Sequence, residues 1–563
     1  MDKSRPSVHP ELARHQDAMK PEIHTLKGHI HFAFGYSVVN CTLIEGDDAC
    51  ILIDTLTSME TAEIVAAELK KITEKPIKTV IYTHFHADHV SGTKAFISDE
   101  QLAARGVEII AQEDLTEHVI RDVGLIAPIL GRRAMYQFGM RLPIGENGTV
   151  GAGLGPPQRP GRRTFVAPTK TFTKFYEGET GGIKFEIHAI PSETEDQCAV
   201  WLPRQQTLLS ADAVYESFPN IYALRGTRFR NPMIWANGVD RLRDFKAEVL
   251  IPHHGHAVEG AEKIDQLLID YRDAVQFVHD QTLRYMNKGY TPDEIKEVVT
   301  MPDRLRNHPW LGEFYGSYKH AIPAIFAGYL GWYQGDPVSL DPTPWTEKAS
   351  RYIKMMGGRN KLIAAAQSAL SDGDAQWAAE LLTWLIRVDH NDTEARALKA
   401  EALRRWAYEQ KNATWRNWAL SSAMELDGDL DLGKAGMVLG SPDQVQGFPL
   451  SGILKVMTVR LKPEESWETH MRVVLETTDS KESCALEIRG GVCQFYELPP
   501  AECDATIKFD RTFLLRWIFG QTTFREALET GSIVADGDNS RVTDFFDKFE
   551  PFNQVDDVAI AVR

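Results

Sequence analysis

Thr83-His84-Phe85-His86-Ala87-Asp88-His89 decides the fold of this chain, because it places four potential metal ligands within six residues. The preceding residues, 78–82, are mostly apolar or β-branched and predict a buried strand. The following residues, 90–93, lead into a predicted helix. We therefore expect the stretch at the carboxyl end of a strand, where open α/β sheets place their sites.

The ligand types in this stretch indicate zinc, which imidazole and carboxylate groups bind well. Side chains alternate in direction along an extended loop, so His84 and His86 can face one metal while Asp88 and His89 reach a second. The alternative is a polar surface loop with histidines by accident. Four potential ligands in this order favour a common cause.

The pattern His-x-His-x-Asp-His resembles the signature of the metallo-β-lactamase superfamily. This resemblance implies an α/β fold of the αββα sandwich type. Predicted strands at 30–45 and 49–54, a hairpin turn at 46–48 and a helix at 61–71 suit the first half of such a sandwich. The motif identifies the fold and leaves the reaction open.

Length and composition limit the classes of protein. At 563 residues the chain is too long for one core, and we expect three or four domains. Its net charge of −17 disfavours nucleic acid as a partner. The six cysteines lack CxxC spacing and are interpreted as reduced or buried thiols. No signal peptide and no membrane span is visible, so we expect a cytoplasmic protein, although a removed secretory signal would leave no trace.

Three further ligands follow from the resemblance. Glu193 stands in the loop after the predicted strand 183–190, where many superfamily members carry a histidine. Asp212 ends the next strand and matches the carboxylate that bridges two metals, and His254 lies in a turn resembling Pro-x-His-Gly. A solvated loop carboxylate is the alternative for Glu193. The resemblance thus implies two zinc ions per chain, held by His84, His86, Asp88, His89, Glu193, Asp212 and His254.

Glu193 and the run from Asn220 to Thr227, which contains Leu-Arg-Gly, resemble the alkylsulfatases of this superfamily, which hydrolyse long-chain alkyl sulfate esters. Residues 315–320, 329–333, 356–358 and 415–417 resemble the dimerisation domain of those enzymes. The resemblance implies that Asn220, Tyr222 and Arg225 contact an anionic alkyl sulfate substrate. It also implies that His320 reaches the substrate from the second domain, a core or surface histidine being the alternative.

A charge count supports the anionic substrate. Two zinc ions would supply four positive charges, which Asp88, Asp212, Glu193 and one hydroxide balance. An anion must then be held by a further group, and the guanidinium of Arg225 fits sulfate oxygens through its planar fork. The alternative for Arg225 is a surface salt bridge.

Arg230 departs from the family pattern. In the alkylsulfatases that the chain resembles, the fifth residue after the arginine of Leu-Arg-Gly is a histidine that protonates the leaving sulfate oxygen. Arginine cannot give up a proton near neutral pH, so we interpret Arg230 as a second cationic clamp. Asp88, Arg225 and Arg230 are the expected catalytic residues.

Three domains are expected: a catalytic domain at 1–275, a helical dimerisation domain at 276–426 and a sterol-carrier-like α/β domain at 436–563. Within the second, 378–382 and 395–400 resemble tetratricopeptide helix pairs, whose apolar faces need a partner, so we expect a homodimer. The third is expected to hold an apolar tunnel for the alkyl tail or, alternatively, a filled core. It begins with a predicted strand at 454–461.

Two segments are expected to lack regular structure. Residues 1–28 read as a loose arm, and 113–180, rich in Gly and Pro, as a flap over the site or a structureless insertion. The favoured function is zinc-dependent hydrolysis of long-chain, primary alkyl sulfates such as dodecyl sulfate. The alternatives are another hydrolase on this fold, a phosphodiesterase or lactonase, and a lipid-binding protein with an idle metal site. Glu193 and Arg225 favour the first.

Overall fold

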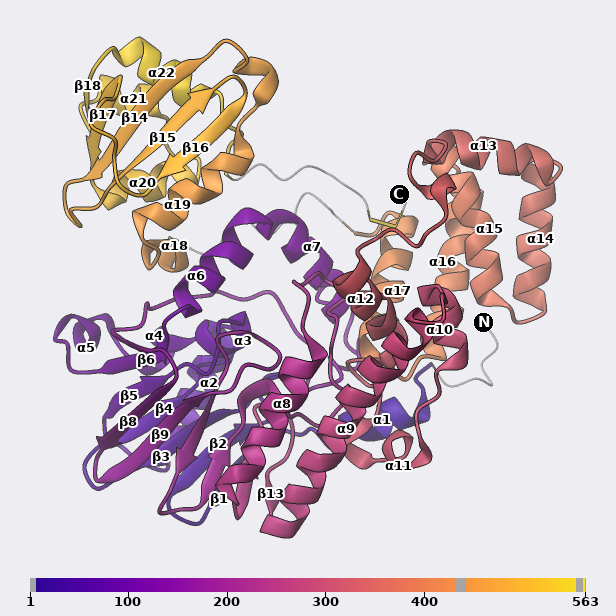
Figure 1. Ribbon diagram of the computed structural model, residues 1–563, viewed down its shortest axis with the longest axis horizontal. Coiled ribbons are helices and arrows are strands. Elements are labelled where there is room, and N and C mark those ends of the chain that lie inside the picture. The colour runs from indigo at the N-terminus through magenta and orange to yellow at the C-terminus, as the bar shows by residue number, and fades with distance from the viewer. Residues whose placement is uncertain (1–6, 431–441, 553–559, 562–563) are drawn as a thin grey trace.

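Two stacked β-sheets form the centre of the first domain (Figure 1). The structure is a computed structural model that describes residues 7–430, 442–552 and 560–561. The first sheet runs in chain order through β1 (Glu22–Leu26), β2 (Ile30–Phe34), β3 (Cys41–Glu45), β4 (Cys50–Ile53), β5 (Ile77–Ile81), β6 (Glu108–Gln112) and β7 (Lys170–Phe172). The second has the order β13 (Val258–Glu259), β12 (Val249–Ile251), β11 (Thr207–Leu209), β10 (Cys198–Leu202), β9 (Ile183–Ala189) and β8 (Phe175–Thr180).

Apolar side chains from both sheets meet in one core. Phe32, Ile53 and Ile81 of the first sheet pack with Val200 and Ile251 of the second. Helix α2 (Met59–Lys70) covers the outer face of the first sheet, while α8 (Pro232–Leu242) and α9 (Ala261–Met286) cover that of the second. This arrangement confirms the expected αββα sandwich. Helix α9 runs through residue 276, the expected start of the second domain.

Two expectations for the N-terminal region are wrong. Residues 10–17 form α1 (Pro10–Asp17), and β1 follows as the edge strand of the first sheet. Leu12 and Met19 are buried, which is why this polar segment is held in place. The predicted strand at 30–45 is two strands, β2 and β3, that pair antiparallel.

Residues 113–180 are more regular than expected. They contain α6 (Leu115–Ile120), the π-helix η1 (Arg121–Leu125) and α7 (Ala127–Phe138), followed by β7 and β8. Leu115, Val119 and Tyr136 are buried along this helical run, so apolar contacts stabilise it despite the Gly and Pro content of the segment. The glycine-rich part, 148–155, is largely buried. Gly153 has a φ of 82° and lies directly against the backbone of Phe314, where a side chain would not fit.

Shorter helices complete the first domain. They are α3 (Ala87–Val90), α4 (Thr93–Phe96), α5 (Asp99–Ala103), η2 (Ala211–Ala213) and η3 (Arg243–Phe245).

The second domain is helical. It contains α10 (Pro292–Val298), α11 (Asp303–Arg306), η4 (Pro309–Leu311), α12 (Tyr318–Leu330), η5 (Pro337–Ser339), α13 (Trp345–Met355), α14 (Arg359–Ser371), α15 (Ala375–Val388), α16 (Thr393–Tyr408) and α17 (Ala413–Asp427). Neighbouring helices from α14 to α17 pack against each other, with Leu382, Leu385 and Ala402 in their core. Helix α17 also packs on α7, and Tyr136 donates a hydrogen bond to Glu425 there. Among the described residues, no helix is long and apolar enough to cross a membrane.

The C-terminal domain is a five-stranded sheet with helices. Its elements are α18 (Pro442–Gln446), α19 (Leu450–Met457), η6 (Thr458–Arg460), η7 (Pro463–Glu465), β14 (His470–Thr477), β15 (Ser483–Arg489), β16 (Val492–Tyr496), β17 (Ala505–Phe509), α20 (Arg511–Ile518), α21 (Phe524–Glu529), β18 (Val534–Asp536) and α22 (Asn539–Asp547). The predicted strand at 454–461 is wrong, because most of it belongs to α19 and η6. Phe513, Phe524, Phe545 and Phe546 pack inside this domain. The expected start of the third domain, residue 436, lies within 431–441, outside the described residues.

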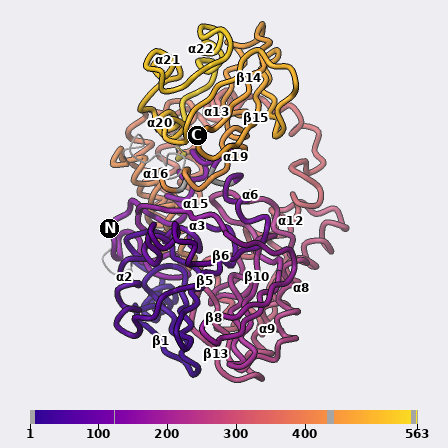
Figure 2. The backbone as a smooth tube through the Cα atoms, turned by 90° about the vertical axis from the view of Figure 1, so that its left-hand side faces the viewer, coloured from indigo at the N-terminus to yellow at the C-terminus, as the bar shows by residue number. Residues whose placement is uncertain are grey.

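The C-terminal domain rests on the catalytic domain, above α6 and η1 (Figures 1 and 2). Gly124 of η1 lies against Val456, and Gly452 of α19 lies against Ile120, so each glycine makes room for a side chain of the opposite helix. Phe448 packs on Phe165, with ring centroids 5.8 Å apart. The two domains therefore share one hydrophobic core along this contact.

Candidate metal centre and substrate cavity

The seven expected ligands come from loops that follow four different strands or from the short helices in those loops. His84 and His86 follow β5, and Asp88 and His89 lie on the single-turn helix α3. The other three are Glu193 after β9, Asp212 in η2 after β11, and His254 after β12. All of these strand ends lie at the same edge of the sandwich, which brings the side chains together.

The structure divides six of these side chains into two groups. His84, His86 and Asp212 form one group, and Asp88, His89 and His254 form the other, with donor atoms within 4.8 Å of one another in each. Asp212 lies between the groups: its Oδ2 is 3.6 Å from Nε2 of His84 and 3.1 Å from Nε2 of His254. Glu193 lies beside the first group, 3.9 Å from Nδ1 of His86.

Hydrogen bonds outside the cluster set the orientation of two histidines. Nδ1 of His89 donates to Asp54 at 2.6 Å, and Nδ1 of His254 donates to the carbonyl of Val38 at 2.5 Å. Asn40 holds the turn that carries His254 by donating to the carbonyls of Pro252 and Gly255, each at 2.8 Å. Such contacts fix which ring nitrogen is left for a metal.

The donor set fits a cation. With Nδ1 carrying the proton, a neutral His254 directs the lone pair of Nε2 at Asp212, which is repulsive unless a positive charge lies between them. Burial lowers the pKa of His89, but Asp212 and Asp54 outweigh it and raise that pKa well above its ordinary value, so this place favours positive charge. Oδ1 of Asp212 and Oε2 of Glu193 are buried without a hydrogen-bond partner among the described residues. These atoms are the ones that a bound metal would satisfy.

Asp54 contacts the cluster through His89, and the sequence analysis did not identify it as part of the site. It follows β4, has an unusual positive φ of 56°, and accepts hydrogen bonds from the backbone and hydroxyl of Thr83 at 2.8 and 2.7 Å. An aspartate at the end of a strand beside the motif strand was the available signal.

Replacing Asp54 by Asn is expected to lower metal affinity or activity by about 10- to 100-fold, because the amide cannot hold His89 as the carboxylate does. Metal affinity is measured by competition with a chelator, beside Asp48→Asn, an exposed carboxylate in the turn before β4, as the control. Equal metal affinity and equal turnover in both variants would contradict the role given to Asp54.

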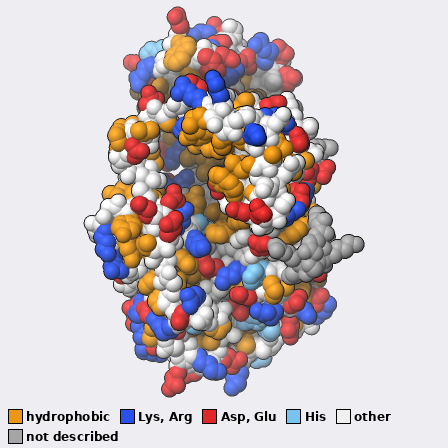
Figure 3. Space-filling model, turned by 90° about the vertical axis from the view of Figure 1, so that its right-hand side faces the viewer, with side chains coloured by type: hydrophobic (Ala, Val, Ile, Leu, Met, Phe, Trp, Pro, Cys, Tyr) orange, Lys and Arg blue, Asp and Glu red, His pale blue; other side chains and the backbone are white. Residues whose placement is uncertain are grey.

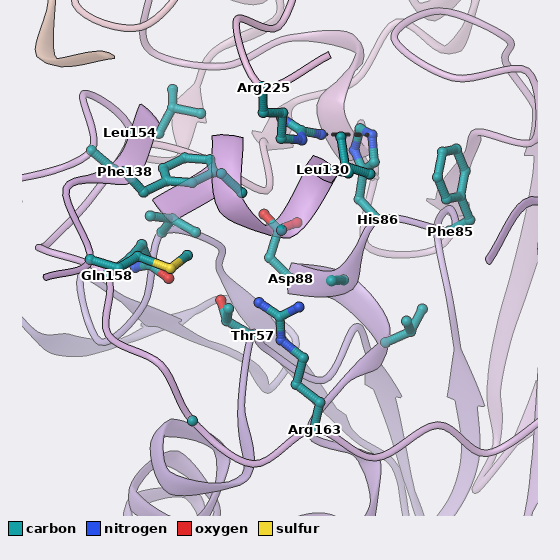
Figure 4. Close-up of a pocket in the computed structure, with 18 of the residues that line it drawn as sticks. Thr57, Phe85, His86, Asp88, Leu130, Phe138, Leu154, Gln158, Arg163 and Arg225 are labelled. Carbon is teal, nitrogen blue, oxygen red and sulfur yellow. Dashed lines mark hydrogen bonds between the residues drawn. The ribbon is translucent and has the colours of Figure 1, made fainter. Parts of the chain in front are cut away.

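Arg225 lies beside the first ligand group. Its Nη2 is 3.5 Å from Nε2 of His86, as the dashed line in Figure 4 marks. Gln137 accepts a hydrogen bond from the Arg225 backbone at 2.7 Å, and Arg133 donates to the Arg225 carbonyl at 2.7 Å, so α7 fixes this loop. If His86 presents Nδ1 to a metal, its Nε2 carries a proton and cannot accept from Arg225, whose donors then point to another acceptor.

Arg230 is buried and contacts the cluster through Glu193, away from the cavity. Its Nη1 donates to Oε1 of Glu193 and, at 2.8 Å, to the carbonyl of Asn220. Its Nη2 is buried without a hydrogen-bond partner among the described residues. Burial raises the pKa of Glu193, and the Arg230 guanidinium acts against that rise.

The structure places the remaining expected substrate residues further out. Asn220 is buried next to Arg230, and the ring of Tyr222 is 6.5 Å from that of His320. His320 belongs to α12, where Nδ1 accepts a hydrogen bond from Trp415 at 2.9 Å and burial lowers its pKa to about 4. A neutral, hydrogen-bonded His320 thus joins α12 to α17, and its contact with substrate stays a prediction.

A cavity of about 360 Å³ opens on the cluster. His86, Asp88, Glu193, Asp212 and His254 form its polar end together with Arg225. Much of the remaining wall is apolar and comes from α6, α7 and the glycine-rich segment: Val119, Ala127, Leu130, Ala134, Phe138 and Leu154. Figure 4 shows Phe138 and Leu154 on one side of the Asp88 carboxylate.

Two further side chains line this cavity that the sequence analysis did not name as site residues. Tyr315 reaches it from the helical domain, and burial raises its pKa to about 12 although Arg225 acts against the rise. Arg163 reaches it from the segment between α7 and β7. Tyr315 belongs to the run 315–320 that resembles the dimerisation domain, and Arg163 belongs to no recognisable motif.

Two stacked sheets with potential metal ligands at their strand ends define the metallo-β-lactamase fold class. The family models that match this chain agree with that class. Family models match residues 35–256 as the metallo-beta-lactamase superfamily, residues 291–429 as alkyl sulfatase dimerisation, and residues 438–555 as alkyl sulfatase C-terminal.

The similarity to known proteins extends over nearly the whole chain. A linear primary-alkylsulfatase of Pseudomonas sp. (strain ATCC 19151) is 40% identical over 90% of this chain and 98% of its own. An (R)-specific secondary-alkylsulfatase of Pseudomonas sp. is 32% identical over 93% of this chain and 80% of its own. A solved stereoselective inverting sec-alkylsulfatase of Pseudomonas sp. superposes with a TM-score of 0.92 at 28% identity, over 98% of this chain and 88% of the other. The chain belongs to the alkylsulfatase family.

Proposed function

We propose that this protein hydrolyses long-chain primary alkyl sulfate esters with two zinc ions bound by the seven ligands. The observation that carries this proposal is the single cavity that joins the donor cluster and Arg225 to an apolar wall. Each methylene group that leaves water for such a wall contributes about 0.8 kcal/mol. The high identity to a linear primary-alkylsulfatase supports the substrate class.

The residues divide the work by position. When bound, two zinc ions supply a hydroxide nucleophile at neutral pH by lowering the pKa of water. Arg225 holds the sulfate group, and the apolar side chains of α7 align the alkyl chain, so the first carbon of the chain faces Asp88 and the cluster. The carbon–oxygen bond breaks, its electron pair stays on the sulfate, and the cations around the cluster stabilise that charge.

Hydrolysis of dodecyl sulfate in ¹⁸O-labelled water tests this proposal, with metal analysis of the same sample. We expect two zinc ions per chain and the label in dodecanol. Label in the sulfate would mean that the sulfur–oxygen bond breaks. Preference for a phosphodiester or a lactone would support the other hydrolases, and protein that binds dodecyl sulfate without zinc and without turnover would be the lipid-binding alternative.

We also propose a homodimer formed through the helical domain. Large apolar side chains are exposed around α12 and α13, with Trp332 at 67%, Leu330 at 59% and Trp345 at 59% exposure. Figure 3, seen from the side of α13–α16, shows hydrophobic side chains gathered around a hollow. A partner subunit would cover such side chains.

Light scattering is expected to give the mass of a dimer at about 1 µM protein, corresponding to ordinary dimer affinities. Trp332→Asp should shift the mass toward the monomer, because a charge would be buried in the interface. Trp467→Asp, at a tryptophan of the C-terminal domain with 64% exposure, is the matched control. A wild-type protein that is monomeric at this concentration would refute the dimer.

A further inference from the structure

A second arginine faces the cluster from the side opposite Arg225. Arg163 lines the cavity, and Figure 4 shows its guanidinium beside Thr57, directed at the Asp88 carboxylate. The guanidinium of Arg225 lies on the far side of Asp88 in the same view. The two cations thus flank the polar end of the cavity, where an anionic head group would lie.

The backbone around Arg163 is fixed on both sides. Before it, the carbonyl of Arg162 accepts a hydrogen bond from the backbone of Met59 at 2.8 Å. After it, Thr164 donates to the carbonyl of Ser91 through its backbone at 2.8 Å and through its hydroxyl at 3.0 Å. Ser91 follows directly on the helix that carries Asp88 and His89, so Arg163 is anchored to the same element as the ligands.

Arg163 also differs from its neighbour in environment. The side chain of Arg162 is 65% exposed and pairs with Glu60 and Glu63 on α2. Burial lowers the pKa of Arg163, and Asp88 acts against that change. An arginine stays charged even so, and a charge held in a low-dielectric cavity interacts strongly with an anion placed there.

Arg230 is placed differently, since its Nη1 binds Glu193 and the Asn220 carbonyl and its side chain does not form part of the cavity wall. Arg163 occupies the position that the sequence analysis gave to Arg230, that of a second cation facing the substrate. We propose that Arg163 is a further substrate-binding residue, which contacts the sulfate oxygens from the side opposite Arg225. This inference rests on the proposed function.

The two arginines match the change of charge in the reaction. The oxygen of water bonds to the first carbon of the chain, the carbon–oxygen bond breaks, and its electron pair remains on sulfate. The products are the alcohol, one released proton and a sulfate with two negative charges in place of the single charge of the ester. Two guanidinium groups therefore bind the departing sulfate more strongly than the ester, which is the differential binding that catalysis requires.

The test compares Arg163→Gln and Arg163→Lys with the wild type, each loaded with zinc. Arg204→Gln, at an exposed arginine in the turn between β10 and β11, is the control. We measure kcat and KM on dodecyl sulfate, inhibition by inorganic sulfate, and zinc content. For Arg163→Gln we expect kcat/KM to fall by roughly 10²-fold, as for a lost oxyanion donor, and the inhibition constant of sulfate to rise, with zinc content unchanged. Arg163→Lys should recover part of both, since it keeps the charge without the fork.

Three results would overturn the proposal. One is wild-type kcat/KM and wild-type sulfate inhibition in Arg163→Gln. Another is a loss of zinc or of thermal stability with unchanged sulfate inhibition, which would make Arg163 structural. If the wild type hydrolyses no sulfate ester, the proposed function fails separately, and calorimetric binding of inorganic sulfate to zinc-loaded wild type and Arg163→Gln still decides: equal binding, or none to either, refutes the contact.

Discussion

Asp212→Ala is expected to lose at least one metal ion and nearly all turnover. The carboxylate of Asp212 lies between the two ligand groups, 3.6 Å from Nε2 of His84, 3.5 Å from Nε2 of His89 and 3.1 Å from Nε2 of His254. These histidines hold the pKa of Asp212 well below its ordinary value although burial opposes its charge. Removing it takes a negative charge from a buried cluster that would hold two cations under the proposed function.

The expected size of the loss in kcat follows from substitutions at metal sites that do not remove a ligand. Residues that only orient a ligand cost 10- to 100-fold when replaced, so loss of the shared carboxylate should cost more than about 100-fold in kcat. Asp212→Asn keeps the shape without the charge and should fall between Asp212→Ala and the wild type. Asp48→Ala, at an exposed turn, should keep two zinc ions and full activity.

Zinc per chain by mass spectrometry of the metal, together with kcat on dodecyl sulfate, checks this result. His84→Ala should behave like Asp212→Ala, because His84 belongs to the same ligand group. An Asp212→Ala protein with two zinc ions and wild-type kcat would contradict the assignment of Asp212 as a metal ligand.

Arg230→Ala is expected to lower kcat by about 100-fold, at the upper end of the 10- to 100-fold cost of replacing a residue that orients a metal ligand. The structure gives a physical reason that the sequence did not: Arg230 forms a buried ion pair with Glu193. Removing one member of such a pair costs about 3–5 kcal/mol in stability, unless the remaining charge finds another partner. A zinc ion on Glu193 would be such a partner, so the loss in stability should be larger in metal-free protein.

Arg230→His tests whether the side chain at position 230 acts on the sulfate as well as on Glu193. Histidine titrates near neutrality, so this variant should regain part of the activity and show a new acidic limb in the pH profile of kcat. Arg228→Ala, at an exposed arginine two residues away, is the control. The prediction is wrong if Arg230→Ala keeps wild-type kcat and KM on every sulfate ester tested.

The cluster could be predicted from the sequence because its members are placed by strand ends. A side chain that follows a buried strand lies at a known edge of the sheet, which placed His84 and Asp88 after β5. Glu193, Asp212 and His254 lie at three further strand ends and were expected from the family resemblance. The αββα sandwich followed from the same strands. These features depend on local patterns together with one recognisable motif.

The features that were missed depend on contacts distant in sequence. Nothing near Arg230 indicates that it pairs with Glu193, 37 residues away, and nothing near Arg163 indicates that it faces Asp88. The expected strand at 454–461 is mainly helical because a short apolar run fits either structure, and packing of α19 on η1 decides between them. Helices α6 and α7 were not predicted because the residues around them are rich in Gly and Pro.

The core shared by the first and last domains has a consequence for how the chain folds during synthesis. Ile120 and Phe165 leave the ribosome roughly three hundred residues before Gly452 and Phe448, the residues that lie against them. Domains generally fold in order from the N-terminus, so the catalytic domain carries an uncovered apolar strip until the C-terminal domain has been synthesised. The C-terminal domain therefore covers an apolar surface of its own chain that would otherwise favour aggregation.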